Sequence, residues 1–345
     1  MKIDFTYNKE KIDYIEGYIL KGAFYRCNYT RFKTLYDKPY KGTENVQLYN
    51  FEPKGNIEAS IFIVPGLGSR NIKFLLWMGT HLASAGIHST IIVLPGNYTR
   101  VEDSSVSGKS FIKPDIKTMY RFWEHAVVDI LSSIDLLEQK GVWKENNCLM
   151  GYCLGGMLSF IVSALDKRFN QTIFMTTGGY FPKIIHKSKV TKFARRLFKN
   201  GFRDNSFYIH DKKRLYSTYE TQFPKIKEAS LLEILNSEKF HPLFRIDPIS
   251  YAHLLDKSKI TFIDALFDET IPLYSKAVLF NEMSGSKRYI IPMTHVSWLP
   301  FERFLSEYIL LKLNMNNRHY RKLVLKKQNL NFPFIDYLSK WKNNN

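Results

Sequence analysis

The chain has 345 residues, of which 45% are hydrophobic and 15% aromatic, a composition that supports a large buried core and excludes intrinsic disorder. No apolar run approaches the roughly 20 residues of a membrane span, and acidic residues interrupt every apolar stretch near the N-terminus, which argues against a signal peptide. The three cysteines are too few for a disulfide framework or a zinc site. We therefore expect a cytoplasmic protein without a metal or cofactor.

The formal net charge of +18 is concentrated in one segment of the chain. Residues 183–227 contain thirteen Lys or Arg and three acidic residues. A second basic cluster near the C-terminus consists of Arg318, Arg321, Lys322, Lys326 and Lys327. Such charge can recruit an anionic substrate or a membrane surface, and the alternative is an ordinary solvated surface. We expect no nucleic-acid partner.

Short apolar runs alternate with helical patterns along the chain. The predicted strands are Val46–Phe51, Ala59–Val64, His88–Leu94, Asn146–Met150, Gln171–Thr176, Lys259–Ala265 and Lys287–Ile291. The predicted helices are Ile72–Ala85, Ile116–Lys140, Gly155–Leu165, Leu273–Glu282 and Pro300–Leu313. This rhythm predicts an α/β fold with a mostly parallel central sheet and helices on both faces. The first two strands look like a hairpin, so we expect the first to be antiparallel.

One long interval contains no such strand. Residues 180–258 are helical where they show a pattern, and they are too long for a simple loop. We interpret them as a cap, or lid, inserted into a core formed by residues 1–179 and 259–345.

Within this interval, residues 190–199 have the pattern of a basic amphipathic helix. Its apolar positions are Val190, Phe193, Ala194, Leu197 and Phe198, and its basic positions are Lys192, Arg195, Arg196 and Lys199. Gly201 is expected to end the helix. Our hypothesis is that the apolar face roofs an acyl pocket while the charges recruit an anionic substrate or surface. The alternative is a helix packed on its own protein with solvated charges.

The motif with the strongest chemical meaning is Gly151-Tyr152-Cys153-Leu154-Gly155-Gly156. It follows a predicted strand and begins a predicted helix. A nucleophile flanked by glycines at this spacing occupies a strained strand–helix turn, where the helix N-terminus favours the cysteine thiolate. The alternative is a small buried cysteine without chemistry.

An acid and a histidine follow later strands. Asp268 comes just after the strand 259–265, and His295 just after the strand 287–291. The order nucleophile, acid, histidine is that of the α/β-hydrolase triad, and open parallel sheets place their sites at the carboxyl ends of strands. We therefore predict a Cys153–His295–Asp268 triad. Glu269 is the nearer rival for the acid, and Asp264 is a weaker one.

Two backbone N–H groups are needed to stabilise the oxyanion of a tetrahedral intermediate. The first is expected from Leu154, directly after the nucleophile. The second is expected from Leu67 in the turn Pro65-Gly66-Leu67-Gly68, which follows a predicted strand, and a plain turn is the alternative. The run Ser107-Gly108-Lys109-Ser110 lacks the first glycine and the preceding strand of a phosphate-binding loop, so we reject a nucleoside triphosphatase.

The segment Gly151–Gly156 resembles the nucleophile elbow of dienelactone hydrolases and polyhydroxyalkanoate synthases, which belong to the cysteine-nucleophile type of α/β-hydrolase. The resemblance covers roughly residues 45–180 and 258–313. It implies an α/β-hydrolase fold with Cys153 as nucleophile, Asp268 as acid and His295 as base. We expect a hydrolase of an ester, lactone or thioester. The alternatives are an acyltransferase or polyester synthase that uses acyl-coenzyme A, and a non-catalytic binding module with the same fold.

Overall fold

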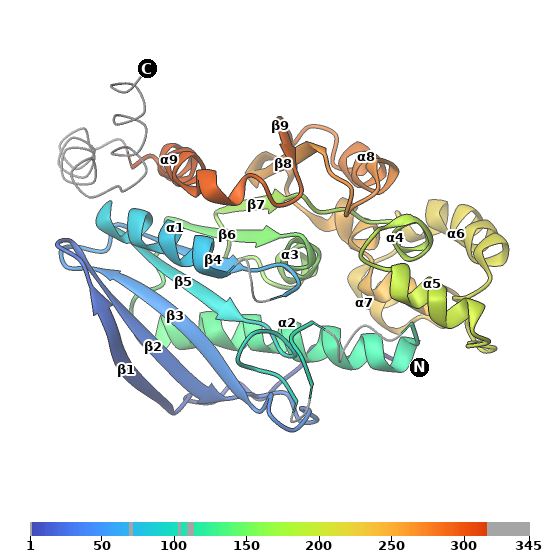
Figure 1. Ribbon diagram of the computed structural model, residues 1–345, viewed down its shortest axis with the longest axis horizontal. Coiled ribbons are helices and arrows are strands. Elements are labelled where there is room, and N and C mark those ends of the chain that lie inside the picture. The colour runs from blue at the N-terminus through green and yellow to red at the C-terminus, as the bar shows by residue number, and fades with distance from the viewer. Residues whose placement is uncertain (1, 69–71, 103–104, 109–113, 316–345) are drawn as a thin grey trace, which may run out of the picture.

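The computed structural model describes residues 2–68, 72–102, 105–108 and 114–315, which fold around a nine-stranded sheet (Figure 1). The strands are β1 (Tyr14–Lys21), β2 (Tyr25–Lys33), β3 (Asn45–Pro53), β4 (Ala59–Val64), β5 (Ile87–Val93), β6 (Asn147–Tyr152), β7 (Gln171–Met175), β8 (Ile260–Phe267) and β9 (Lys287–Thr294). Their order across the sheet is β1-β2-β3-β5-β4-β6-β7-β8-β9. The basic cluster at 318–327 lies outside the described residues.

The central strands are buried on both faces. Every residue of β4, β5 and β6 is buried, and these strands together with β7, β8 and β9 pair in parallel. Aliphatic runs without alternation are suited to this position because helices cover the sheet from both sides. The predicted α/β fold with a mostly parallel sheet is therefore confirmed.

The covering helices form two layers. Helices α1 (Ile72–Ser84) and α9 (Glu302–Lys312) contact each other, and α2 (Ile116–Gln139) contacts α3 (Leu154–Leu165). Figure 1 shows the central strands running between α1 and α2. Helix α8 (Leu273–Glu282) connects β8 to β9, and the boundaries of these helices agree with the sequence prediction to within about two residues.

The N-terminal part of the sheet differs from the prediction. Strands β1 and β2 were not expected, and β3 does not form a hairpin with β4 but pairs antiparallel with β2 and β5. The antiparallel direction of β3 was predicted correctly. Strand β1 lies at the sheet edge with all eight residues exposed, so its sequence carries no pattern of burial that could have identified it.

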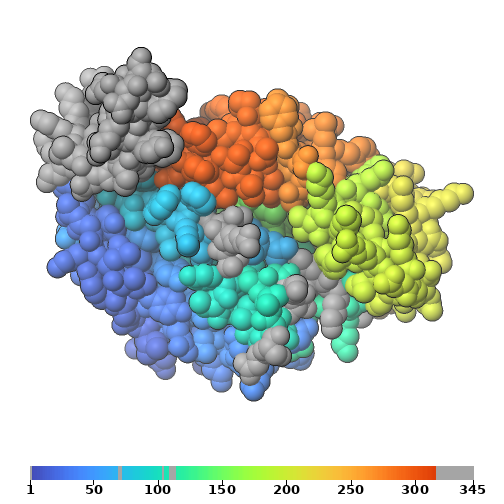
Figure 2. Space-filling model, in the orientation of Figure 1, coloured from blue at the N-terminus to red at the C-terminus, as the bar shows by residue number. Residues whose placement is uncertain are grey.

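Four α-helices lie between β7 and β8. They are α4 (Phe181–Lys187), α5 (Lys192–Lys199), α6 (Lys212–Ile226) and α7 (Leu231–Asn236), and the 3₁₀ segments Pro242–Ile246, Pro248–Leu254 and Lys257–Lys259 follow them. Figure 1 shows these helices beyond the carboxyl ends of the central strands, and Figure 2 shows the same segment as a lobe at one end of the molecule. None of the described helices is long and apolar enough to cross a membrane.

A buried carboxylate connects the beginning and the end of this segment. Asp247 accepts hydrogen bonds from the backbone N–H groups of Tyr180 and Phe181 at 2.9 and 2.6 Å. It also accepts one from the Tyr219 hydroxyl in α6, at 3.2 Å. Because these donors lie at the start of α4 and within α6, Asp247 holds the helices of the interval together over the sheet.

Candidate active site

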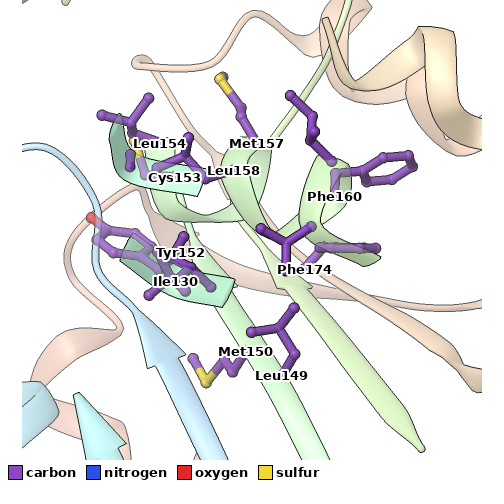
Figure 3. Close-up of a cluster of buried hydrophobic side chains, with 14 of the residues drawn as sticks. Ile130, Leu149, Met150, Tyr152, Cys153, Leu154, Met157, Leu158, Phe160 and Phe174 are labelled. Atoms are coloured by element: carbon purple, nitrogen blue, oxygen red, sulfur yellow. The ribbon is translucent and has the colours of Figure 1, made fainter. Parts of the chain in front are cut away.

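Cys153 lies at the turn between β6 and α3, as Figure 3 shows. Its backbone has φ 55° and ψ −117°, a combination that an L-residue adopts only under strain. The turn is held by hydrogen bonds from the Cys153 N–H to the Met175 carbonyl and from the Thr177 hydroxyl to the Cys153 carbonyl, at 3.0 and 2.9 Å. The strained strand–helix turn predicted from the glycine spacing is thus present.

The glycine at position 155 is required by close packing. A Cβ at Gly155 would lie 2.1 Å from the Val64 carbonyl oxygen and 2.4 Å from that of Pro65. The first turn of α3 therefore touches the backbone at the end of β4, and any side chain at this position would push the elbow away from the neighbouring strand. This contact explains why the motif needs glycine two residues after the cysteine.

Asp268 and His295 follow the ends of the adjacent parallel strands β8 and β9, and they meet. The His295 Nδ1 atom is 3.0 Å from Asp268 Oδ1. That oxygen also accepts the N–H groups of Thr270 and Ile271 at 2.8 and 3.0 Å. The Asp268 side chain is fully buried and that of His295 is 8% exposed, so the pair is shielded from bulk water.

The contacts in the structure distinguish Asp268 from the two other candidate acids. Asp264 binds Arg288, with its Oδ2 2.8 Å from Nε and 2.7 Å from an Nη atom. Glu269 is exposed and pairs with Lys189. Of the three acids considered from the sequence, Asp268 is the one hydrogen-bonded to His295.

The backbone of His295 is fixed from two sides. Its carbonyl accepts hydrogen bonds from Trp298 Nε1 at 3.0 Å and from the Tyr152 hydroxyl at 3.3 Å. Tyr152 is the neighbour of Cys153 in the elbow, so it connects the nucleophile turn to the histidine loop. The His295 Nε2 atom is buried, and the interaction of this imidazole with the Cys153 side chain contributes to its raised pKa.

The electrostatics favour a protonated His295. Burial lowers the pKa of this imidazole, but the negative charge of a Cys153 thiolate and the hydrogen bond to Asp268 raise it by more, to about 10. Burial raises the pKa of the Asp268 carboxyl, whereas the hydrogen bond and positive charge of His295 lower it by more, so the net pKa lies below its ordinary value. His295 and Asp268 therefore favour an imidazolium and a carboxylate together.

Lys276 is a buried neighbour of the triad that the sequence analysis did not single out. Its Nζ donates to the Ala265 carbonyl at 2.8 Å and lies 3.4 Å from Asp268 Oδ2. A signal was available, because Lys276, Leu279 and Met283 follow at i, i+3 and i+7 and all three are buried. A lysine within an apolar helical stripe needs a buried partner, and here that partner is the acid.

The turn expected to supply the second oxyanion donor lies beside the nucleophile. A Cβ at Gly66 would be 2.9 Å from the Cys153 Cβ, and both Leu67 and Leu154 line the same cavity as Cys153. The neighbouring Gly68 N–H donates to Asn97 Oδ1 at 2.8 Å. Asn97, which follows β5, was not predicted from the sequence, because nothing in its local pattern indicates that it reaches this turn.

Cys153 and His295 open into a cavity of about 280 Å³. Its walls come from α2, α3, α4 and α5, and include Trp123, Met157, Ile184 and Phe193. No Lys, Arg, Asp or Glu lies among the described residues that line it. The cavity therefore offers an apolar environment directly beside the thiol.

The other two cysteines have a different environment. Cys27 and Cys148 are 1% and 0% exposed, and burial raises the pKa of each thiol to about 12. Both are therefore protonated and enclosed in the core at neutral pH, and neither lines the cavity.

Solved structures share this architecture. The chain matches an acetyl xylan esterase from Paenibacillus sp. R4 with a TM-score of 0.60 and 14% identity, over 87% of this chain and 89% of that one. It matches acetyl xylan esterase 1 from Thermoanaerobacterium sp. JW/SL YS485 with a TM-score of 0.55 and 14% identity, over 90% and 89% of the two chains. For the acylaminoacyl peptidase of Pyrococcus horikoshii the TM-score is 0.55 and the identity 15%, over 84% and 41%.

No protein-family model matches the sequence, and no curated protein matches it. The likeness to the solved structures concerns the fold, because the identities are too low to transfer an activity. Together with the strand order and the elbow, it identifies an α/β-hydrolase fold.

Proposed function

We propose that this protein is an acyl hydrolase that acts on an ester, lactone or thioester through Cys153, His295 and Asp268. The observation that carries the proposal is the buried hydrogen bond between Asp268 and His295, together with the cavity that His295 and the strained elbow residue Cys153 both line. The esterases and the peptidase with the same fold support the coarser assignment of a hydrolase. The cysteine chemistry rests on the geometry of this chain.

The reaction has two halves. The Cys153 thiolate attacks the substrate carbonyl carbon, and the N–H groups of Leu154 and Leu67 are the expected donors to the resulting oxyanion. When the intermediate collapses, the bond to the leaving group breaks, His295 gives that group its proton, and a thioester remains on Cys153. His295 then takes a proton from water, whose oxygen attacks the thioester and releases the carboxylic acid and the thiolate.

The nucleophile is tested by trapping the acyl-enzyme. Incubation with p-nitrophenyl butyrate followed by mass spectrometry of the intact protein should show one butyryl group, and peptide mapping should place it on Cys153. Cys153→Ala should lose the adduct and turnover while remaining folded by circular dichroism. Cys148→Ala is the matched control and should retain both.

Two results would contradict this proposal. Turnover by Cys153→Ala at the wild-type rate would exclude Cys153 as the nucleophile. Absence of both an adduct and turnover in the wild-type protein, across esters and thioesters, would favour a binding module with this fold.

The second candidate is an acyltransferase that uses acyl-coenzyme A. The observation in its favour is the set of exposed cations on α5 and α6, next to the cavity roof: Lys192, Arg196, Lys199, Lys212, Lys213 and Arg214. Such a surface can bind the phosphates of coenzyme A. Incubation with short acyl-coenzyme A separates the two functions, because a hydrolase releases free acid with each coenzyme A whereas a transferase or polyester synthase releases an acylated product or a polymer.

A further inference from the structure

The cavity beside Cys153 also limits which acyl groups this site can accept. We infer that its substrates carry an apolar acyl chain of medium length, bound beneath α4 and α5. This inference rests on the proposed function, because it assigns the cavity to the acyl group that is transferred to Cys153.

The chemical character of the walls favours hydrocarbon. The lining contains aromatic and aliphatic side chains from four helices and four residues with hydroxyl groups, of which Tyr152, Ser188 and Thr191 donate to backbone carbonyls. The Ser188 hydroxyl donates to the Thr270 carbonyl. The Thr191 hydroxyl donates to the Ile184 carbonyl at 2.7 Å and accepts from Arg195 at 3.0 Å. A sugar or a charged acyl group would lose its hydration in this cavity, where His295 at the reacting end is the one charged group among the described lining residues.

The size of the cavity sets the chain length. An engineered apolar cavity of about 150 Å³ holds one benzene ring, and the cavity here measures about 280 Å³. By proportion it holds roughly ten to twelve carbon atoms. Acyl groups from octanoyl to dodecanoyl fill it, whereas an acetyl group leaves most of the walls without contact.

The roof of the cavity is formed by α4 and α5, which a side-chain hydrogen bond connects. Arg195 in α5 donates to the Ile185 carbonyl in α4 at 3.1 Å, so the two helices are held together. Helix α5 then ends in a Schellman motif, with Gly201 at φ 93° and the Phe202 N–H bonded to the Leu197 carbonyl at 3.0 Å. Ala194 and Phe193 present the inner face of α5 to the cavity, and Leu197, which is 39% exposed, does not line it.

Ala194 is therefore a residue that determines chain length. Its side chain is 3% exposed, and a larger group at this position would occupy part of the space that receives the end of the acyl chain. Phe193 has the opposite role, because replacing its ring with a smaller side chain would lengthen the cavity.

The test is the chain-length profile of kcat/KM for p-nitrophenyl esters from acetyl to palmitoyl. Each added methylene should raise kcat/KM by about fourfold until the cavity is full, with a maximum between octanoyl and dodecanoyl. Ala194→Leu should move the maximum to shorter chains and lower kcat/KM for decanoate at least tenfold more than kcat/KM for butyrate. Phe193→Leu should move it to longer chains. Leu197→Phe, an enlargement on the outer side of the same helix, should leave the profile as in the wild type.

The outcomes separate this inference from the proposed function. A flat profile, or a maximum at acetyl, with acylation still dependent on Cys153 would overturn the inference and leave the cysteine hydrolase standing. The same holds if folded Ala194→Leu and Leu197→Phe give identical profiles. Loss of acylation at Cys153 for every chain length would instead count against the proposed function itself.

Discussion

Lys276 and Asp268 form an ion pair inside the protein, with Nζ 3.4 Å from Oδ2 and side chains that are 2% and 0% exposed. The lysine lies on the side of the carboxylate opposite the oxygen that binds His295. It therefore helps to keep Asp268 charged while His295 binds the other oxygen. Under the proposed function Lys276 is a positioning residue, because it would act on the reaction only through Asp268.

Replacement of Lys276 by Met should reveal this role. The change leaves the buried Asp268 carboxylate without its lysine partner and the Ala265 carbonyl without its donor, so the free energy of unfolding should fall by about 3 kcal/mol at neutral pH. The loss of the positive charge also raises the pKa of Asp268, so the acid limb of the pH profile for kcat/KM should move to higher pH. Urea denaturation and a pH–rate profile measure the two effects. An unchanged acid limb in a destabilised variant would show that Lys276 supports only the fold.

The pKa of His295 depends on the charge of Cys153. Because the thiolate stabilises the imidazolium, Cys153→Ser should lower the pKa of His295 from its raised value, which NMR titration of the imidazole Cε1 proton can follow. In the wild type, activity should persist through neutral pH and decline as His295 deprotonates near pH 10, because the leaving group then lacks its proton donor. An imidazole that titrates identically in both proteins would mean that the two side chains do not interact.

Asn97 positions the turn expected to donate to the oxyanion. Its Oδ1 accepts the Gly68 N–H at 2.8 Å, and its removal should misplace the Leu67 N–H. We expect Asn97→Ala to lower kcat by roughly tenfold to a hundredfold with little change in KM, since an oxyanion donor acts on the transition state. Thr99→Ala, a change at an exposed contact in the same loop, is the control. A variant with a raised KM and an unchanged kcat would assign Asn97 to substrate binding.

Not every basic side chain of α5 is available to an external partner. Arg195 is engaged by the Ile185 carbonyl and Thr191, whereas Arg196 is exposed. If the exposed charges recruit an anionic substrate or surface, Arg196→Glu should raise KM for anionic substrates more at low salt than at high salt, because exposed charges are screened within about 10 Å. Neutral esters serve as the control. Equal KM values for both substrate types, together with unchanged binding to anionic vesicles, would leave Arg196 as solvated surface.

The parts of the fold that could be predicted from sequence are those in which burial leaves a local pattern. Strands β4 to β8 have apolar runs because most of their residues are buried, and α2 has a long amphipathic repeat with Asp115 as its N-cap. Strand β9 was predicted from its aliphatic residues although none of its residues is buried. Strand β1 was missed because it is exposed along its whole length. The pairing of β3 with β5 was missed because a neighbouring strand in the sheet need not be the next strand in the chain.

The residues of the candidate site also differ in how far the local sequence indicates them. Cys153, Asp268 and His295 were predicted as a triad because each follows a strand and the three occur in a recognised order. Lys276 and Asn97 reach the site by long-range contacts, from α8 to the end of β8 and from the loop after β5 to the turn after β4. Such contacts depend on how the elements pack, so the local sequence offers only an apolar helical stripe around Lys276 and no signal for Asn97.

The different environments of Cys153 and the two core cysteines allow the fraction of functional molecules in a preparation to be measured by thiol titration. Cys27 and Cys148 are protonated and inaccessible in the folded state, so a thiol-specific alkylating reagent at neutral pH should consume one equivalent per native chain and three after denaturation. The native value divided by one third of the denatured value then gives the fraction of a preparation with an intact site. This ratio would convert every bulk rate into a turnover number per competent molecule.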